Sequence, residues 1–280
     1  MPSVCFYFQV HQPFRIKHYS VFDIGKDHFY EDGEKNKWIM DKVSEKCYLP
    51  ANKKMLELIK RHKGKFRISY SLSGTVIEQM ELFRPDVLQS FVELAKTGCV
   101  EFLSETYFHS LSFLYNKEEF ERQVKEHDQK IEQYFKQKPT VFRNTELIYN
   151  NELAAYIEKL GYKGILCEGV DRLLKEKHPN HLLKPTGTKS IKALLKNYRL
   201  SDDIAFRFSD KNWSEWPLHA DTFASWVHKV AGTGDVINLF MDYETFGEHQ
   251  WESTGIFDFM DHLPREILKH PDFGFMTPSQ

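Results

Sequence analysis

Short runs rich in β-branched and aromatic residues alternate with longer amphipathic stretches along the whole chain, and this alternation constrains the fold more than any other feature. It is typical of a parallel sheet built from successive β–α units. Most of the runs carry apolar residues at both odd and even positions, as strands covered on two faces do. Seven such runs predict strands at Val4–Val10, Phe66–Leu72, Cys99–Glu105, Thr140–Glu146, Gly164–Glu168, Ile204–Phe208 and Val236–Asp242.

Five stretches between these runs each carry a single apolar stripe, which predicts amphipathic helices. Two of them stop just before Gly161 and Gly232, and a glycine after the last turn is a common helix end. The predicted helices are Asn52–His62, Asp86–Lys96, Glu118–Lys136, Asn151–Leu160 and Asp221–Ala231. The stretches Gln12–Leu49 and Gly169–Thr186 show no clean period, and we expect them to be loops that wall a site.

Polar or ionisable residues follow almost every predicted strand at its C-terminal end. An open doubly wound sheet concentrates its chemistry at one switch point, whereas a barrel collects polar groups from all of its strands at one mouth. The sequence therefore favours an α/β fold with a barrel of parallel strands. The residues concerned are His11, Gln12, Ser73, Glu105, His109, Arg143, Asn144, Glu146, Glu168, Ser209, Asp210, Asp242 and Glu244.

Composition narrows the range of partners and cellular locations. Because 38 Lys and Arg residues face 40 Asp and Glu residues, we expect neither nucleic acid nor a membrane as a partner. No apolar run approaches about 18 residues and the N-terminus lacks an export signal, so we expect a cytoplasmic protein. The four widely spaced cysteines indicate neither a disulfide framework nor a zinc cluster, and His178 and His181 are expected in a solvated loop.

Glu146 and Asp242 are the strongest candidates for catalytic groups. Each ends an apolar strand, and the fourth and seventh of seven strands stand nearly opposite each other in a closed ring. Two carboxylates on either side of a mouth are what glycosidic cleavage requires, although either acid alone could cap a helix or form a rim ion pair. Nearby Arg143 and Asn144 would hold Glu146 ionised as a nucleophile, whereas the apolar run before Asp242 would favour a protonated acid.

Four motifs then resemble successive conserved regions of a known family, in order and at strand ends. They are His11-Gln12-Pro13, Gly98–Leu103, Phe142–Glu146 and Met241–Gly247, and the similarity runs from Val4 to Ser279. Together they resemble glycoside hydrolase family 57, and most closely its α-amylase branch.

The resemblance implies an incomplete (β/α)7 barrel with its active site at the C-terminal ends of the strands. It further implies a retaining α-glucan-cleaving enzyme, an α-amylase-like hydrolase or a 4-α-glucanotransferase, that needs no metal or other cofactor. Glu146 matches the family nucleophile and Asp242 its acid/base, while His11 matches a sugar-contacting histidine and Glu101 lies in a region bordering the site. Residues 1–280 are expected to form one catalytic barrel domain from which the family's C-terminal helical bundle is largely absent.

Several further residues are candidate substrate contacts. Trp213 and Trp216 follow the predicted sixth strand, where an indole could stack on a sugar ring or simply cover the barrel rim. His109, Arg143 and His249 occupy similar positions after strands. We therefore expect an α-glucan or maltooligosaccharide substrate, while the sequence leaves the oligomeric state open.

Two other functions remain open from the sequence. A metal-dependent polysaccharide deacetylase also uses an incomplete barrel, but it would require His11, His109 and His249 to converge, and the chain contains no His-x-x-x-His pair. The chain could also be a glucan-binding protein whose catalytic function has lapsed.

Overall fold

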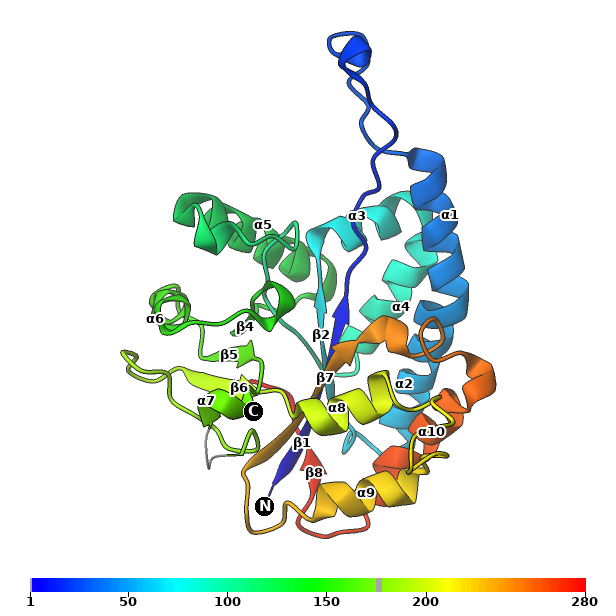
Figure 1. Ribbon diagram of the computed structural model, residues 1–280, viewed down its shortest axis with the longest axis vertical. Helices are drawn as coiled ribbons and strands as arrows, with labels where there is room; N and C mark the ends of the chain where they lie inside the picture. The colour runs from blue at the N-terminus through cyan, green and yellow to red at the C-terminus, as the bar shows by residue number, and fades with distance from the viewer. Residues whose placement is uncertain (1, 175–177) are drawn as a thin grey trace.

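Seven parallel strands form the centre of the molecule (Figure 1), in a computed structural model that describes residues 2–174 and 178–280. They pair in the orders β3-β2-β1-β7 and β4-β5-β6. Two isolated parallel bridges, Ser104–Phe142 and Lys196–Asn238, join these two sheets into a ring. The strands are β1 Ser3–Val10, β2 Ile68–Leu72, β3 Val100–Phe102, β4 Val141–Arg143, β5 Gly164–Cys167, β6 Lys192–Leu195 and β7 Val236–Asp242, and a short β8, Gly274–Phe275, pairs with the start of β1.

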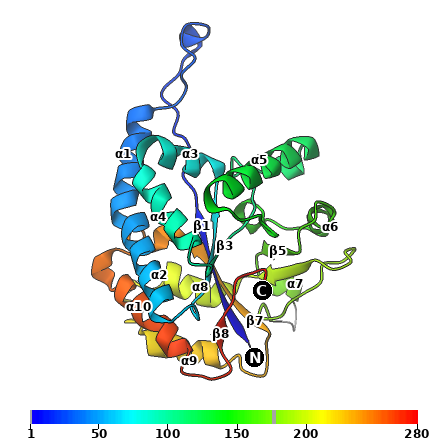
Figure 2. The same ribbon diagram turned by 180° about the vertical axis from the view of Figure 1, so that it is seen from behind.

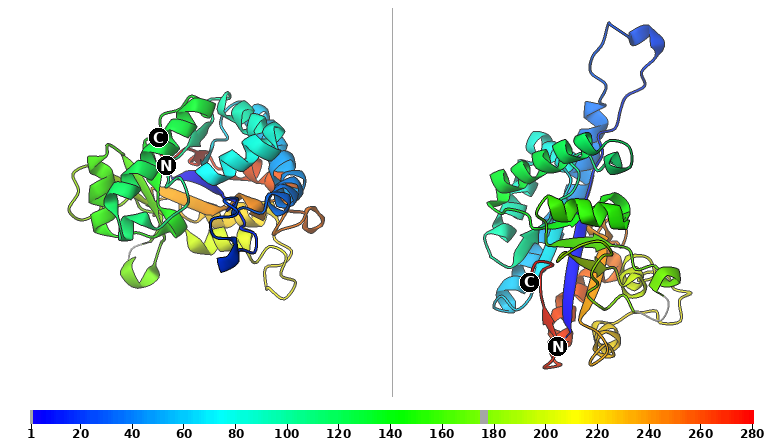
Figure 3. Two further views of the ribbon diagram at one scale, coloured as in Figure 1. Left: turned by 90° about the horizontal axis from the view of Figure 1, so that it is seen from above. Right: turned by 90° about the vertical axis from the view of Figure 1, so that its left-hand side faces the viewer.

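Helices surround this ring and cover the outer faces of the strands (Figure 3). Several begin at a side-chain cap that the sequence supplies, such as Ser73 before α3 and Asn150 before α6. The α-helices are α1 Gly33–Val43, α2 Leu49–Arg61, α3 Gly74–Phe83, α4 Pro85–Ala95, α5 Lys117–Phe135, α6 Asn151–Lys159, α7 Asp171–Leu174, α8 Tyr198–Ala205, α9 Ala220–His228 and α10 Ile256–Ile267. The shorter helical turns are η1 Val21–Asp23, η2 Ser44–Tyr48, η3 Ser112–Leu114, η4 Thr145–Leu147, η5 Tyr243–Thr245 and η6 Glu252–Thr254.

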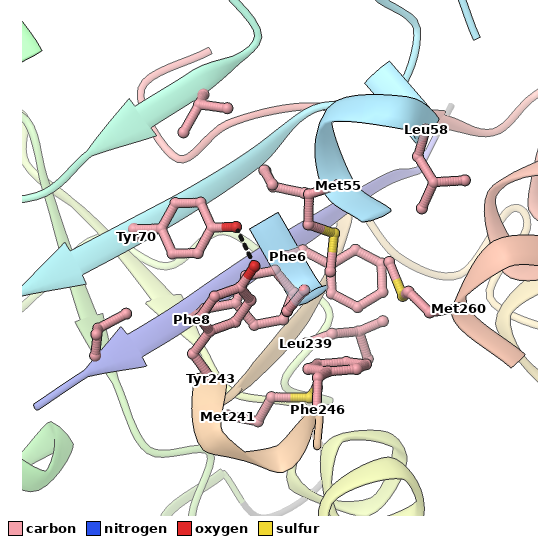
Figure 4. Close-up of a cluster of buried hydrophobic side chains, with 14 of the residues drawn as sticks. Phe6, Phe8, Met55, Leu58, Tyr70, Leu239, Met241, Tyr243, Phe246 and Met260 are labelled. Carbon is pink, nitrogen blue, oxygen red and sulfur yellow. Dashed lines mark hydrogen bonds between the residues drawn. The ribbon is translucent and has the colours of Figure 1, made fainter. Parts of the chain in front are cut away.

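The alternation of side chains along β1 separates an outer core from an inner one. Phe6 and Phe8 belong to a large cluster with residues of the surrounding helices (Figure 4), in which the Tyr70 hydroxyl donates to that of Tyr243 at 3.1 Å. Tyr7, on the opposite face, packs with Phe240 in a small cluster inside the ring. The other members of this inner cluster are Leu103, Val141, Leu147, Leu166 and Leu194. The barrel interior is therefore filled with side chains below its mouth.

Six of the seven predicted strands are confirmed and one is wrong. The predicted strand Ile204–Phe208 lies instead at the C-terminal end of α8 and in the turn that follows. Asn197 caps this helix by accepting from Leu200 N, and helical spacing buries both Ser201 and Ile204. The sixth strand is β6, which precedes α8 in the chain.

The stretch Gln12–Leu49, expected to be a loop, is partly helical. Residues 33–61 form α1, a π-helical segment η2 and α2 in direct succession. Before them, Ile16 and Glu31 pair in an antiparallel bridge at the base of a hairpin-like arm that projects from the body (Figure 2). The other expected loop, Gly169–Thr186, contains the short α7 and a bridge from Leu183 to Ala193 in its described part, and residues 175–177 lie outside the described residues.

No helix in the described part of the chain is both long enough and apolar enough to span a membrane.

Candidate active site

A pocket of about 190 Å³ lies at the C-terminal ends of the strands and is lined by both predicted catalytic carboxylates. Glu146 follows β4 and Asp242 ends β7, so two distant parts of the chain meet at one cavity. The remaining lining residues are Tyr7, Gln9, Arg143, Leu147, Glu168, Lys196, Ala205, Phe206, Phe240, Met241, Thr245 and His249.

The backbone at Glu146 turns sharply and directs its side chain outward. Glu146 has φ 54° and ψ 27°, and the next residue, Leu147, also has a positive φ of 54°. A non-glycine residue rarely adopts this conformation, and such residues often occur at functional sites. Thr145 fixes the turn by donating from its hydroxyl to the Ser110 carbonyl at 2.8 Å. The Glu146 side chain is consequently 72% exposed although its neighbours on either side are buried.

A histidine joins Glu146 to a second, fully buried carboxylate. His109 Nε2 lies 3.1 Å from Glu146 Oε1, and its Nδ1 lies 2.9 Å from Glu105 Oε2. Only the doubly protonated imidazole can donate to both carboxylates. Burial acts to lower the pKa of His109, but the hydrogen bond and the charge of Glu105, together with the hydrogen bond to Glu146, outweigh it and raise that pKa above its ordinary value. The arrangement therefore places a cation between two anions.

This cation sets the protonation state of both acids. The hydrogen bond from His109 holds the pKa of Glu146 below its ordinary value. Burial acts to raise the pKa of Glu105, but His109 and the charge of Arg143 overcome it and lower that pKa to about 2. Both carboxylates are thus ionised at neutral pH, as a nucleophile at position 146 would require.

Arg143 supplies the second positive charge beneath the pocket. Its Nη1 lies 4.0 Å from Glu105 Oε2, and only 6% of its side chain is exposed. Among the side chains that the structure describes, none accepts a hydrogen bond from Arg143 Nε or Nη1. Both atoms are buried, so Arg143 acts on the site through its charge, which also helps to lower the pKa of Glu146.

His11 stacks on His109 at the other side of the relay. The two rings lie 4.1 Å apart between centroids at an interplanar angle of 18°. Burial and the neighbouring His109 lower the pKa of His11 to about 4, so His11 is neutral where His109 is charged. Its Nδ1 lies 2.7 Å from the Ser73 hydroxyl. A neutral imidazole held in this way can donate to or accept from a sugar hydroxyl.

The environment of Asp242 differs from the one predicted. The apolar residues before it are buried, but Asp242 itself is exposed, because it is the last residue of β7. This exposure gives no support to the expectation that the apolar run would favour a protonated Asp242, and its role as the acid stays a prediction.

The buried acid in this region is Glu244. Tyr48 and Gln12 donate hydrogen bonds to it, the latter at 3.2 Å. Burial raises the pKa of Glu244 to about 7, and the negative charge of Asp242 adds to this effect. Glu244 thus links the loop at Gln12 and the end of η2 at Tyr48 to the segment after β7.

The structure brings some of the other predicted residues to the pocket and places others elsewhere. His249 lines the pocket with Glu146 and Asp242. Glu101 accepts from Ser279 N at 3.0 Å, near the N-terminal half of the barrel, whereas Glu105 on the same strand face reaches the site. Trp213 packs against the outer core. The segment that carries it follows α8 and not a strand, so its predicted position directly after a sixth strand is wrong.

Sequence reasoning gave no site role to Glu105, Gln9 or Lys196. Gln9 donates to Glu105 at 3.0 Å and lines the pocket. The signal for Glu105 was present, because positions 101, 103 and 105 share one face of the predicted strand Cys99–Glu105 and only the last lies at its C-terminal end. Lys196 could not be identified as a site residue, because it directly follows β6, a strand that was not predicted.

The described side chains form no cluster typical of a metal site. Within residues 2–174 and 178–280, no group of three or more His, Cys, Asp and Glu side chains is arranged to hold a metal ion.

A parallel β/α barrel with carboxylates at its mouth defines a class of fold that several carbohydrate-active proteins share. The 4-alpha-glucanotransferase of Thermococcus litoralis is similar with a TM-score of 0.73 and 16% identity, over 99% of this chain and 39% of that chain. A "putative polysaccharide deacetylase" of Mycobacterium smegmatis is similar with a TM-score of 0.65 and 12% identity, over 99% of this chain and 87% of that chain. At these identities the likeness concerns the fold alone, and it confirms the predicted (β/α)7 barrel.

The chain belongs to glycosyl hydrolase family 57, whose family model matches residues 5–280. It is also 45% identical over 281 residues to a protein of Methanocaldococcus jannaschii named "Putative alpha-amylase". That match covers 99% of this chain and 58% of the relative, so the chain spans little more than half of the relative's length. The family predicted from the four motifs is confirmed.

Proposed function

We propose that this protein cleaves α-1,4-linked glucose polymers or oligosaccharides with retention of configuration, by hydrolysis or by transfer to another sugar. The observation that carries the proposal is the pocket shared by Glu146 and Asp242, in which His109 keeps the first carboxylate ionised. Membership of glycosyl hydrolase family 57 supports the reaction class. The names of the Methanocaldococcus and Thermococcus proteins support an α-glucan as the substrate.

The proposed reaction has two displacements at the anomeric carbon. In the first, the Glu146 carboxylate attacks this carbon, the glycosidic C–O bond breaks, and Asp242 gives its proton to the departing oxygen. In the second, the Asp242 carboxylate takes a proton from water or an acceptor hydroxyl, whose oxygen attacks the anomeric carbon and displaces Glu146. The glycosyl–Glu146 ester formed in between accounts for retention.

The residues around the two acids have separate parts in this proposal. The Glu105–His109 pair holds the Glu146 carboxylate in place and balances its charge until the ester forms. The neutral His11 beside His109 and His249 in the pocket lining offer hydrogen bonds to sugar oxygens, while the charge of Arg143 helps to keep Glu146 ionised. Each of these contacts requires the sugar to occupy the pocket between β4 and β7.

Incubation with maltoheptaose tests the proposal most directly. The wild-type chain is expected to yield shorter maltooligosaccharides, and longer ones as well if it transfers. Glu146→Gln keeps the shape of the nucleophile but removes its charge, so we expect turnover to fall by at least about 10³-fold. Glu168→Gln, which alters another carboxylate of the same pocket, is the matched control and should lose far less. Equal losses in the two variants would contradict the assignment of Glu146.

Stereochemistry and geometry give independent checks. Product released with the α configuration, followed by NMR, is expected from two displacements, whereas initial β product would indicate inversion. A crystal structure should place the two carboxyl groups about 5–5.5 Å apart for retention, rather than about 6.5–9.5 Å.

Deacetylase activity on an N-acetylated polysaccharide that a chelator abolishes would instead favour the metal-dependent alternative. Binding of maltoheptaose without products would favour a glucan-binding protein.

We further propose that the chain works in a reducing compartment such as the cytoplasm. Its four cysteines all lie within the described residues, and each is buried with a free thiol. Free thiols are usual where glutathione and thioredoxin keep cysteines reduced.

A further inference from the structure

Two surface pockets adjoin each other behind one wall of the catalytic pocket. The first, of about 700 Å³, lies between η2, α2 and the segment that follows β7. The second, of about 600 Å³, lies between residues 216–221 and α10. Asp258, in the first turn of α10, lines both. We name these two adjoining pockets the α10 groove.

Two segments of the chain contribute residues both to the catalytic pocket and to the α10 groove. Thr245 and His249 line the catalytic pocket, whereas Gly247 and Trp251 of the same segment line the groove. Residues 205 and 206 line the catalytic pocket in the same way, and Phe208 lines the groove. Only a few residues of these two segments therefore separate the catalytic pocket from the groove.

The groove carries an exposed tryptophan in each of its two pockets. Trp251 is 62% exposed and Trp216 is 42% exposed, although an indole normally buries most of its surface. A lysine ammonium lies 5.9 Å from the ring centroid in each case, Lys46 beside Trp251 and Lys211 beside Trp216. These contacts restrain the rings without covering them, as a preformed stacking surface requires.

The charges that line the groove nearly cancel. In the first pocket, the described charged residues are three lysines and four carboxylates, namely Lys46, Lys53, Lys54, Glu45, Glu57, Glu252 and Asp258. In the second, Asp221, Asp258 and Glu266 face Arg265 and Lys269. A phosphate or nucleic-acid site would show an excess of positive charge. Mixed donors and acceptors around exposed indoles suit a neutral polyhydroxyl ligand, because sugar hydroxyls both donate and accept.

The size of the catalytic pocket also indicates a need for further contacts. Its volume of about 190 Å³ is below the range of about 300–1,000 Å³ that is usual for small-molecule sites, whereas each half of the groove lies within that range. Only a short part of a polymer could occupy the catalytic pocket.

We infer that the α10 groove is a second glucan-binding surface, on which Trp251 and Trp216 stack against sugar rings of a polymeric α-glucan outside the catalytic pocket. The inference takes its ligand class from the proposed function. It also assigns Trp216, expected from the sequence to contact substrate, to this groove. Binding at two linked places would raise the apparent affinity for long chains without any new contact at the reacting bond.

Affinity electrophoresis in native gels that contain amylopectin tests the inference. The parent is the Glu146→Gln chain, which should bind the polymer without consuming it. We expect the parent to be retarded by amylopectin, and we expect Trp251→Ala or Trp216→Ala to weaken the apparent affinity by about tenfold each. Trp38→Ala, which removes an equally exposed tryptophan from α1 outside the groove, is the matched control and should migrate like the parent.

Several results would overturn the inference. They are a parent that amylopectin does not retard, a Trp216→Ala/Trp251→Ala double variant that migrates like the parent, or an equal loss in Trp38→Ala. If an alanine variant lacks the parent's circular dichroism spectrum, hydrogen exchange of the folded parent decides instead. Amylopectin should then protect residues 208–221 and 247–258, and protection confined to the strand ends of the catalytic pocket would contradict the groove.

The outcome for the groove is distinguishable from that for the proposed reaction. If the wild type cleaves maltoheptaose but the retardation of the Glu146→Gln chain by amylopectin depends on neither Trp216 nor Trp251, the groove is refuted and the proposed reaction stands. Tryptophan-dependent retardation without any cleavage by the wild type refutes the reaction and leaves the groove standing.

Discussion

At the scale of single residues, the position of the Glu146 carboxylate depends on a backbone conformation that costs energy. A left-handed φ costs a non-glycine residue about 1–2 kcal/mol, and both Glu146 and His109, with φ 53°, adopt it. The surrounding hydrogen bonds stabilise these two strained backbone conformations, because Thr145 fixes the turn at Glu146 and His109 is hydrogen-bonded at both ring nitrogens. The strained pair is thus preorganised to present one ionised carboxylate to the pocket.

Removal of the His109 cation should shift the pH dependence of the reaction. His109→Gln deletes the hydrogen bond and charge that hold the pKa of Glu146 below its ordinary value, so that pKa should rise. The acid limb of kcat/KM, which reports protonation of the nucleophile, should then move to higher pH, and kcat should fall by about 10–100-fold. The measurement is a pH–rate profile on maltoheptaose. His181→Gln, in a loop beside Asp235, should leave the acid limb unchanged, and an unmoved limb in His109→Gln would refute this role.

Glu105 should stabilise the fold most strongly above its unfolded pKa. Because its pKa is lowered to about 2 in the folded state, its contribution is complete above about pH 4.5 and is lost as the pH falls towards 2. Glu105→Gln should therefore destabilise the chain by about 3–5 kcal/mol at pH 7, since His109 and Arg143 lose their buried partner. Urea unfolding at pH 7 and pH 3.5 should show a smaller difference for the variant than for the wild type. Glu118→Gln, at an exposed position in the first turn of α5, serves as the control, and a similar pH difference in wild type and Glu105→Gln would argue against the buried pair.

Glu244 should show the opposite dependence on pH. Its folded pKa of about 7 lies above the ordinary value, so the folded state binds the extra proton and stability falls as the pH rises from about 4.5 to 7. Glu244→Gln keeps an acceptor for Tyr48 but carries no charge. Thermal unfolding should therefore show the variant gaining stability relative to the wild type between pH 5 and pH 8, and a relative loss over that interval would contradict the prediction.

At the scale of elements, the largest error of the sequence analysis has a clear physical cause. The run from Ile204 to Phe208 places a large apolar residue at every second position, as a strand with one buried face does, whereas the true strand β6 contains Ala193 and leucines without β-branched residues. The helix cap at Asn197 outweighs the local alternation. Strands with β-branched and aromatic runs, such as β1 and β7, could be predicted because their composition and their burial on both faces agree.

The parity of a strand predicts which residues face the barrel interior, but not how far along its axis they lie. Glu101 and Glu105 share one face of the third strand segment, and only the second reaches the site. Similarly, β4 could be predicted to carry Glu146 to the mouth, but its left-handed turn and the contact with His109 depend on tertiary structure. The catalytic pair could therefore be predicted from sequence, whereas most of the network around it could not.

Gly247 allows the segment after β7 to pass close to η2. It has φ 113°, and a Cβ built there would lie only 1.9 Å from the Lys46 carbonyl oxygen. Gly247→Ala should therefore displace the segment that carries His249, costing several kcal/mol of stability and lowering turnover. Gly255→Ala is the matched control, because its φ is also positive at 84° but its added Cβ meets no described atom within 4 Å. It should cost only about 1 kcal/mol in thermal unfolding, and equal losses in both variants would show that backbone strain alone matters.

At the scale of the whole molecule, the ring of seven strands brings together groups that are far apart in the chain. Glu105 and Glu146 come from the third and fourth units, and Asp242 comes from the seventh. Closure depends on the single bridges at Ser104–Phe142 and Lys196–Asn238, so few backbone contacts hold the two sheets in register. The general plan of alternating strands and helices was predictable from periodicity. A closed barrel was also predicted, from the polar residues at the strand ends, whereas the individual bridges that close it could not be, because they depend on the register of the folded strands.

The pairing of β8 with β1 has a consequence for how the chain can be rewired. Ser3 aligns with Gly274 and Val4 with Phe275, so the first and last segments run side by side. A short Gly/Ser linker from residue 280 to residue 2 could then join the old ends while new ends are opened in the projecting arm between Ile16 and Glu31. Such a circular permutant preserves each of the described strand pairings, and we expect it to retain the far-ultraviolet spectrum and melting temperature of the parent within a few degrees. A permutant opened within β1, between Phe6 and Tyr7, would instead break a strand that pairs with both β2 and β7 and should melt well below it.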